Sequence, residues 1–573
     1  MIYASDPDKK DIESKFWTLA NDFRGRPGFG DSGVLPSALY CAWLLADNGS
    51  SDDLEVLLEA AGLPEWSRDA IMREVADCLP AIRSFAASRP SDELRELALA
   101  SFDLTAVNLG RSGGDFVTPA CITSLALNVL ASGDGDSIAD FGCGWGSFLA
   151  AASGRAASLY GVDSNHRAAA FATMRMSLLG VDCDIERDDM LRRPEGLSFD
   201  RCFSQLPFGL RLPFLNLKGT PYEPALSGDC PLGRPASADW VFAQRILDAT
   251  AGDGRAVIVM GNGATFNHGD ADARRHFAEG GRLEAVVALP ARLFSHTAIA
   301  STMVVFGDGS RGVRMVDATD LTVPGRRYDS MGPDEVAEVM RRLHEDGPMS
   351  KVVCLEELER RDWSLSPQRY LRREIELENA TPLGGLAVAI ERGAGLRAAE
   401  LDELETTEDT GISYLPVSAV ADGRVGGDLP HITSLDPRHD RACLHDGDLV
   451  MTKIGSPVRV AVAEVPEGQT VVATGNLYVV RLDRERIDPY FLAAFLSSDD
   501  GQELACGLAT GTTIPTIALR DLRGLEVPVP PMDVQRRVAE RYQAALDEIE
   551  VHKVRLERAR SAAAGAYDEE MGR

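Results

Sequence analysis

The feature that most constrains the fold is a short apolar run that leads directly into a glycine turn. Residues Ser137–Phe148 read SIADFGCGWGSF, with glycines at Gly142, Gly144 and Gly146. Glycine adopts positive φ and lets the backbone approach a bound ligand closely, so a buried strand can end sharply at such a turn. The segment therefore predicts a strand, a tight turn that faces a ligand, and a helix.

The sequence around this turn indicates a layered α/β domain over residues 111–310. Short apolar runs alternate there with helical stretches. The predicted strands are Ser137–Phe141, Ser158–Val162, Arg201–Ser204, Ala256–Met260, Ala285–Leu289 and Thr302–Phe306. Alternation of this kind is typical of a doubly wound, largely parallel sheet with helices on both faces.

The regions on either side of this domain have different sequence patterns. Residues 1–110 are expected to form a helical domain, because apolar residues recur there at three- and four-residue spacing. The predicted helices are Pro36–Ala46, Asp52–Ala61, Asp69–Cys78 and Ser91–Leu99. Residues 311–381 are mixed and charged, and we expect a closing helix and a connector.

A second globular domain is expected at residues 382–531, where short β-like runs are cut by Gly, Asp and Pro. The clearest runs are Leu449–Ile454, Val458–Glu464 and Leu477–Leu482. Residues 532–573 then form a long helix in which apolar residues alternate at steps of about four and three. That spacing fits a coiled-coil seam, and it equally fits a helix packed on its own domain.

Composition restricts the classes of function. A net charge of −29 argues against extended contact with phosphates, although a local basic cleft on an acidic body remains compatible with it, as does a basic protein partner. No apolar run approaches the roughly 18 residues of a membrane span, and the charged start resembles no secretory signal, so the cytoplasm is the expected location. The ten cysteines and nine histidines lack metal-ligand spacing, so no metal site is expected.

The acidic residues around the glycine turn point to the kind of ligand. A dinucleotide fingerprint needs its third glycine three residues after the second, where this chain has Ser147. Asp140 before the turn would repel a pyrophosphate but suits the amino group of S-adenosylmethionine. Asp163 ends the next strand, where it can accept hydrogen bonds from ribose hydroxyls. Asp189 can accept from an adenine amino group, with Met190 packed on the ring.

Two further segments complete a family pattern. Thr118 and Pro119 read as a helix start in which Thr118 caps the helix. The stretch Leu283–Ile299 reads LEAVVALPARLFSHTAI. Together with the glycine turn, these segments make residues 110–310 resemble the modification subunit of type I restriction-modification systems, which are adenine-N6 DNA methyltransferases of the γ arrangement. Phe16-Trp17 and Arg24-Gly25 resemble the leading domain of that subunit.

The resemblance implies S-adenosylmethionine as cofactor and assigns its contacts. Thr118 and Pro119 would contact its methionine end. Asp140, Gly142 and Gly144 match the family's first motif, Asp163 its ribose acid and Asp189 its adenine acceptor.

The same resemblance locates a catalytic motif that departs from the family. Members carry Asn-Pro-Pro-Phe or Asn-Pro-Pro-Tyr, whose amide oxygen and next carbonyl accept both N6 hydrogens while the aromatic ring stacks on the flipped-out base. This chain has Gln205-Leu206-Pro207-Phe208. Gln carries its amide on one more methylene, and a misplacement of about 1 Å can cost roughly 10²-fold in rate.

Two interpretations of this motif stay open. Either Gln205 works as the acceptor at a reduced rate, or the chain is a catalytically impaired subunit that binds S-adenosylmethionine and DNA. Ser204 is a further possible acceptor, one residue out of register. Methylation of RNA or of a protein amide is a rival activity, which an appended DNA-recognition domain argues against.

The C-terminal half supplies such a domain by a second resemblance. Its segments Pro382–Leu386, Gly447–Gly455, Pro489–Leu492, Gly511–Pro515 and Leu525–Pro531 are similar, in order and spacing, to one target-recognition half of a type I specificity subunit. The resemblance implies contact with double-stranded DNA. Candidate contacts are Lys453, Arg459, Thr512 and Thr513, although the two cations also fit ordinary surface charges and Gly511–Thr513 a plain turn.

A specificity subunit usually carries two such halves, and this chain has one. We therefore expect a homodimer through the C-terminal helix and a palindromic, interrupted recognition site. No nuclease constellation or ATP phosphate loop is recognisable, so DNA cleavage would need a separate restriction subunit.

Overall fold

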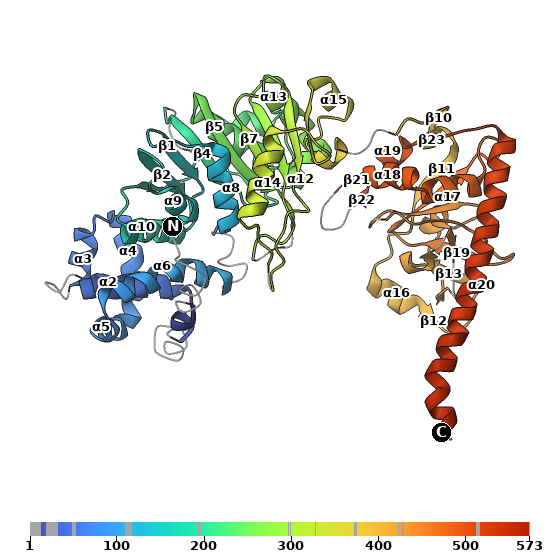
Figure 1. Cartoon of the computed structure of the whole chain (residues 1–573), viewed down its shortest axis with the longest axis horizontal. Helices are drawn as coiled ribbons and strands as arrows, with labels where there is room; N and C mark the ends of the chain where they lie inside the picture. Colours follow the sequence, from blue (N-terminus) through green and yellow to red (C-terminus); the bar gives the residue numbers. More distant parts are fainter. Residues whose placement is uncertain are drawn as a thin grey trace. The chain divides into compact units, whose positions relative to one another are not determined.

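The computed structural model describes residues 13–18, 32–47, 53–108, 117–192, 196–295, 297, 299–326, 328–371, 375–421, 423–425, 429–455, 457–510 and 516–571. The chain divides into two compact units, Met1–Leu371 and Arg372–Arg573 (Figure 1). Each unit is described by itself.

The N-terminal part of the first unit is helical. Its helices are α2 (Leu35–Asp47), α3 (Leu54–Ala60), α4 (Glu65–Val75), α5 (Leu79–Ala86) and α6 (Ser91–Asn108). Helices were expected near α2, α3, α4 and α6, whereas α5 was not predicted. Their core also takes in Trp145 of the glycine turn, whose ring centroid lies 4.8 Å from that of Phe171. The helical region is therefore packed directly against the ligand-facing turn.

A sheet of nine strands follows, in the order β3-β2-β1-β4-β5-β7-β6-β8-β9. The strands are β1 (Ser137–Phe141), β2 (Ser158–Asp163), β3 (Asp184–Arg187), β4 (Phe199–Gln205), β5 (Thr250–Gly261), β6 (Leu283–Ala288), β7 (Ser301–Phe306), β8 (Val313–Asp317) and β9 (Ser350–Val353). Strand β7 runs antiparallel between β5 and β6, and β9 runs antiparallel to β8. The remaining strands end at one common edge, which we call the carboxyl edge.

All six predicted strands are present, as β1, β2, β4, β5, β6 and β7. Strands β8 and β9 lie in the segment 311–381 for which a closing helix and a connector were expected, and they extend the sheet. The closing helix is α14 (Pro333–His344).

Helices cover both faces of the sheet. The core of one face includes residues from α11 (Asp239–Asp248), α12 (Gly263–Phe266) and α13 (Ala271–Glu279). The core of the other includes residues from α8 (Ala120–Leu130), α9 (Ser147–Ala152), α10 (His166–Leu179) and α14. The short helix α15 (Leu355–Arg360) follows β9. This arrangement confirms a mixed α/β fold with a large, mostly parallel sheet.

The second unit is built from smaller sheets. A six-stranded sheet has the order β11-β20-β17-β18-β15-β14, a four-stranded sheet the order β12-β16-β13-β19, and β10-β23 and β21-β22 form two-stranded pairs. The strands are β10 (Ala380–Pro382), β11 (Ala387–Arg392), β12 (Glu405–Thr406), β13 (Ile412–Leu415), β14 (Val420–Ala421), β15 (Gly423–Val425), β16 (His431–Ile432), β17 (Leu449–Thr452), β18 (Val460–Val462), β19 (Thr470–Ala473), β20 (Leu477–Leu482), β21 (Ala509–Thr510), β22 (Thr516–Ile517) and β23 (Glu526–Pro528). The helices are α16 (Ala398–Leu404), α17 (Pro489–Ser497), α18 (Asp499–Gly507), α19 (Leu519–Arg523) and α20 (Met532–Met571).

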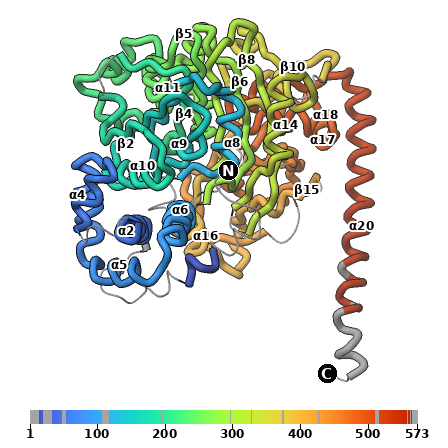
Figure 2. The backbone as a smooth tube through the Cα atoms, turned by 60° about the vertical axis from the view of Figure 1, so that its left-hand side comes forward, coloured from blue at the N-terminus to red at the C-terminus, as the bar shows by residue number. Residues whose placement is uncertain are grey.

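Helix α20 has two parts with different surroundings. Near its start, Gln535 is buried; its Oε1 accepts from the backbone N of Asp488 at 2.9 Å and its Nε2 donates to the Pro530 carbonyl at 2.8 Å. Leu546 is still buried, but Ile549 and Leu556 are 41% and 51% exposed. Figure 2 shows the later part extending past the rest of its unit as one rod. Packing on its own domain thus accounts for the first part alone. Among the described residues, no helix is long and apolar enough to cross a membrane.

Candidate active site

The glycine turn is held open at the carboxyl edge. Gly142, Gly144 and Gly146 have φ of 79°, 53° and 71°, the left-handed region that favours glycine. The backbone N of Gly142 donates to the Val162 carbonyl at 2.8 Å, which ties the turn to β2. A Cβ atom added at Gly142 would meet nothing within 4 Å. The turn therefore has open space in front of it, as a ligand cradle requires.

Asp140, the acid before the turn, is buried and incompletely paired. Its side chain is buried at the end of β1, and its Oδ1 has no hydrogen-bond partner among the described residues. Burial raises the pKa of Asp140 well above its usual range, and the charge of Asp163 adds to this. A buried carboxylate without a partner is costly unless a cationic group reaches it. The ammonium and sulfonium groups of S-adenosylmethionine fit that need.

Asp163 lies at the end of the neighbouring strand and braces the turn. Its Oδ2 accepts from the backbone N of Gly144 at 2.9 Å, and its Oδ1 from the backbone N of Asn165 at 2.7 Å. Burial raises the pKa of Asp163, while these two hydrogen bonds lower it. Each carboxylate oxygen still has a free lone pair, so the residue can accept hydroxyl hydrogens as well.

The side chains of Asp189 and Met190 differ in their exposure to solvent. The Oδ1 of Asp189 accepts from the backbone N of Leu191 at 3.0 Å, and its half-exposed carboxylate lies 3.7 Å from Arg192. Met190 is largely buried in the core that contains Phe141. The Asp189 carboxylate is therefore accessible from solvent, whereas most of the Met190 side chain is not.

Thr118 and Gln205, far apart in the sequence, meet at this edge. The Thr118 Oγ1 donates to the Gln205 Oε1 at 3.2 Å. The N-cap of α8 is Pro119, without a side-chain cap bond, so the expectation that Thr118 caps this helix is wrong. Its hydroxyl is instead directed at the amide on β4, because the longer Gln side chain reaches it.

The rest of the catalytic motif is divided between core and surface. Ser204 is fully buried, with its Oγ donating to the Phe141 carbonyl at 2.5 Å, so its burial argues against a role as the alternative acceptor. Leu206 is buried, and its backbone N donates to the Val259 carbonyl at 2.9 Å. Pro207 is exposed and Phe208 half-buried. The Phe208 ring packs edge-to-face on Phe294, with centroids 4.9 Å apart. The catalytic motif and the Leu283–Ile299 stretch thus share one site.

Two buried carboxylates behind this site were not found from the sequence. Asp239 and Asp270 are both buried. The Ser237 hydroxyl donates to Asp239, and the Ser237 backbone N donates to Asp270 at 2.9 Å. Burial, the largest cause, raises the pKa of Asp239 to about 6. Because the backbone N of Ala238 donates to the Leu210 carbonyl at 2.9 Å, these residues anchor the loop that follows Phe208. The Asp239-Trp240 pair at a helix start was the available signal.

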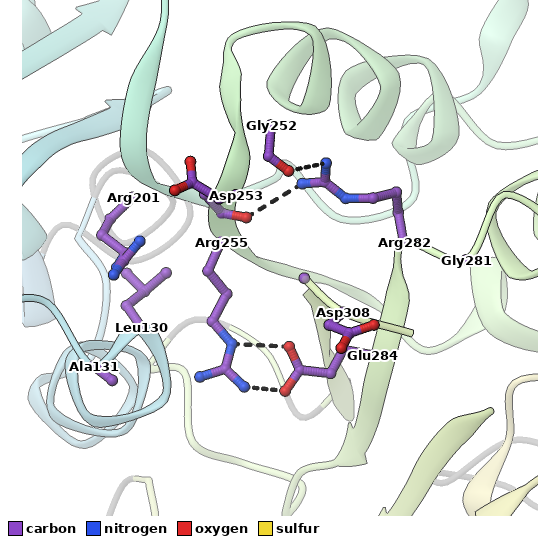
Figure 3. Close-up of a pocket in the computed structure, with 12 residues that line it drawn as sticks. Leu130, Ala131, Arg201, Gly252, Asp253, Arg255, Gly281, Arg282, Glu284 and Asp308 are labelled. Carbon is purple, nitrogen blue, oxygen red and sulfur yellow. Dashed lines mark hydrogen bonds and ion pairs between the residues drawn. The ribbon is translucent and has the colours of Figure 1, made fainter. Parts of the chain in front are cut away.

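A cavity of about 520 Å³ lies at the opposite edge of the sheet, and its lining includes three arginines, Arg201, Arg255 and Arg282 (Figure 3). Its arginines are already engaged. Arg255 pairs with Glu284, and Arg282 donates to the carbonyls of Gly252 and Gly254 at 3.0 and 3.2 Å. These bonds tie strand ends together, while the Nε atoms of Arg201 and Arg282 are buried without a hydrogen-bond partner among the described residues. Among the described residues, no group of three or more His, Cys, Asp or Glu side chains is arranged to hold a metal ion.

The candidate DNA contacts of the second unit gather around one strand connection. Lys453 and Arg459 both belong to the segment between β17 and β18, and Arg459 is exposed. The backbone N of Ile517 donates to the Lys453 carbonyl at 2.9 Å, which sets Lys453 beside β22. Strands β21 and β22 bracket residues 511–515. Thr512 and Thr513 therefore lie outside the described residues, next in sequence to strands that reach Lys453.

Comparison with known proteins finds a family model that matches part of the first unit. The N-6 DNA Methylase family matches residues 96–379. The chain is 25% identical over 299 residues to the type I restriction enzyme MjaIX methylase subunit of Methanocaldococcus jannaschii, covering 47% of this chain and 53% of that protein. It is 23% identical over 307 residues to the MpnII methylase subunit of Mycoplasma pneumoniae, covering 48% and 56%. The chain thus spans about half the length of these curated relatives.

A solved structure is also similar, with lower sequence identity than these relatives. The methyltransferase subunit of a type I restriction-modification system from Streptococcus thermophilus shares 15% identity with a TM-score of 0.49, covering 63% of this chain and 99% of that one. The family match itself spans every cofactor and catalytic residue discussed above. Residues 96–379 therefore match the N-6 DNA methylases, and S-adenosylmethionine is the cofactor of this part of the chain.

Proposed function

We propose that this chain methylates the N6 atom of adenine at a specific sequence in double-stranded DNA, as the modification component of a restriction-modification system. The observation that carries the proposal is the meeting of Thr118, Gln205 and Phe208 at the edge where the glycine turn opens. The relatives support the same class, since both are named methylase subunits of type I restriction enzymes.

The residues at the carboxyl edge have separate proposed roles in binding the cofactor and in binding the target base. S-adenosylmethionine supplies an electrophilic methyl group when it is bound. Asp140 would offset its positive charge, and Asp163 and Asp189 would accept hydrogen bonds from its ribose and adenine. The Gln205 Oε1 and the Leu206 carbonyl accept the two N6 hydrogens of a flipped-out adenine, which frees the nitrogen lone pair. The exposed part of Phe208 stacks on the base, and Phe294 braces its ring.

The second unit is proposed to read the DNA sequence. It has cores of its own, and Lys453 and Arg459 project from one connection beside the β21–β22 pair. We further propose a homodimer through the later part of α20, a separate restriction subunit for cleavage, and a cytoplasmic location.

A second candidate function is favoured by the same Gln205 contact. The Gln205 Oε1 already accepts from Thr118, and Leu206 lacks the fixed φ of the family's proline. On this alternative the chain binds S-adenosylmethionine and DNA, and acts as a recognition or assembly subunit without transferring the methyl group.

Sequencing of modified bases separates the two functions. The full chain is expressed in a host that lacks adenine methylation, and its genomic DNA is read by single-molecule sequencing. The enzyme predicts a new N6-methyladenine motif. The recognition subunit predicts no motif, together with measurable binding of both S-adenosylmethionine and duplex DNA by the purified protein. Loss of both binding activities would overturn both candidates.

A further inference from the structure

A short hairpin projects from the carboxyl edge just after β8. The backbone N of Val323 donates to the Ser330 carbonyl at 2.7 Å, and the backbone N of Ser330 donates back at 3.0 Å. Inside the turn, the Asp329 carboxylate accepts from the backbone N of Gly325 at 3.0 Å. We call the described residues 323–326 and 328–330 the edge hairpin. Its internal bonds give it a defined conformation.

The edge hairpin is fixed to the candidate base pocket. The backbone N of Asp329 donates to the Arg292 carbonyl at 2.8 Å, and the Asp329 carboxylate lies 3.7 Å from the Arg292 guanidinium. Arg292 stands two residues before Phe294, whose ring packs against Phe208. Arg292 and Phe294 therefore connect the hairpin to Phe208, the ring proposed to stack on the base.

The backbone at Arg292 is unusual and fits a functional element. Its φ is 61°, a left-handed conformation that side chains other than glycine adopt at a cost. Strained residues of this kind are concentrated at functional sites, where the surrounding structure holds them in place. In this conformation the Arg292 carbonyl accepts from the hairpin and the guanidinium is half exposed.

The surface of the edge hairpin combines a free cation with exposed apolar groups. Arg326 is exposed and forms no ion pair in the part of the chain that the structure describes. The nearby carboxylates are already engaged, Asp329 as described and Asp320 by two bonds from Arg342 at 2.7 and 2.9 Å. Val323 and Tyr328 are 43% and 37% exposed. On a chain with a net charge of −29, this pairing of cation and apolar surface suits a nucleic-acid backbone.

We propose that the edge hairpin contacts the DNA backbone beside the flipped adenine, with Arg326 and Arg292 on phosphates and Tyr328 on a sugar or base face. The inference rests on the proposed function, because it takes DNA as the substrate of this edge. It also explains how a strongly acidic chain obtains phosphate contacts at the site of chemistry.

The test measures how salt weakens the binding of duplex DNA to the full chain. Each lost phosphate contact lowers the slope of log affinity against log salt by about 0.9. Arg326→Ala should show this reduction, and Arg326→Lys should keep most of the wild-type slope because it keeps the charge. The matched control is Arg155→Ala, since Arg155 is also exposed and precedes β2 at the opposite edge. Binding of S-adenosylmethionine and the melting temperature should be unchanged in all three variants.

The outcomes distinguish this inference from the proposed function. A wild-type slope for Arg326→Ala, as expected if the hairpin serves a protein partner, overturns the inference and leaves the proposed function standing. An equal loss for Arg155→Ala also overturns it, because the effect would then be general. A wild-type chain that binds no duplex DNA contradicts the proposed function itself.

Discussion

At the scale of single residues, Gln205 is the proposed acceptor and would decide whether bound cofactor leads to methyl transfer. Its oxygen is held by Thr118, about one methylene beyond the position that an Asn would give it. We predict that Gln205→Asn raises the rate of methyl transfer, on the order of 10²-fold if misplacement alone limits it. Incorporation of labelled methyl groups into DNA carrying the recognised site measures the rate.

The control for this prediction uses Thr118. Thr118→Val should change the transfer rate in the Gln205 chain, whereas in the Gln205→Asn chain it should matter less, because Asn is too short to reach the hydroxyl. Binding of S-adenosylmethionine, measured by calorimetry, separates this coupling from the expected contact of Thr118 with the cofactor. Equal or lower transfer by Gln205→Asn would show that the amide at this position is not the acceptor.

We predict that the ionised Asp140 carboxylate lowers the stability of the folded, cofactor-free protein and strengthens binding of the cofactor. Because burial raises its folded pKa, the folded chain holds this proton more tightly than the unfolded chain does. The contribution of Asp140 to the stability of the cofactor-free protein is therefore most favourable below the ordinary carboxyl pKa of 3.8, and it is lost as pH rises from there through the folded pKa. At pH 7, Asp140→Asn should raise the melting temperature by about 1 °C for each kcal/mol of unfolding free energy that it adds to a unit of this size, while weakening S-adenosylmethionine binding.

Scanning calorimetry of Asp140→Asn measures the melting temperature, and titration calorimetry of the same variant measures S-adenosylmethionine binding. Asp253→Asn is a suitable control, because Asp253 is exposed at the opposite edge of the sheet. Tight cofactor binding by Asp140→Asn would remove Asp140 from the cofactor site.

The sequence was informative about residues whose roles depend on chain order, and silent about those set by tertiary contact. Asp140, Asp163 and Gln205 follow strands, so their common edge could be predicted. The direction of the Thr118 hydroxyl could not, because a cap bond and a bond to β4 look the same in sequence. Asp239 and Asp270 come together across 31 positions through Ser237, and no spacing rule links them.

At the scale of secondary-structure elements, the glycine turn can be tested against a matched position. Gly142 and Gly62 have nearly equal φ, 79° and 76°, and an added Cβ meets nothing within 4 Å at either. Alanine at either position should cost roughly 1–2 kcal/mol of folding free energy from strain alone. We predict that only Gly142→Ala also weakens S-adenosylmethionine binding, since its Cβ enters the ligand space. Chemical denaturation and calorimetry measure the two effects, and equal cofactor affinity in both variants would contradict the cradle.

Strand prediction succeeded where burial on both faces gives continuous apolar runs, as in β1, β5 and β7. The strand list missed the two edge strands, β3 and β9, and also β8, which lies between β6 and β9. Strand β3 reads DIER, with only Ile185 buried, because an edge strand close to solvent needs fewer apolar residues. Strand β9 reads SKVV and pairs only with β8, so its pattern is too short to separate from a loop.

At the scale of the whole molecule, the proposed dimer through the later part of α20 would link the oligomer to the form of the DNA site. Ile549 and Leu556 lie seven residues apart on this rod, and both are largely exposed, as the seam of a two-stranded coiled coil would be before pairing. One recognition unit per chain then reads one half-site, and two-fold symmetry makes the methylated motif an interrupted palindrome. Ile549→Glu combined with Leu556→Glu would leave charges in that seam, so it should convert a dimer into a monomer in sedimentation experiments.

The same double variant should lose methylation of the full palindrome while keeping the affinity of a single chain for S-adenosylmethionine, because the cofactor site lies in the other unit. Glu548→Gln is the control, since Glu548 is also exposed on this part of α20 but outside the apolar stripe. A wild-type chain that sediments as a monomer and methylates an asymmetric motif would contradict the dimer. The apolar stripe on α20 would then need another partner, and the single recognition unit would have to read the whole site by itself.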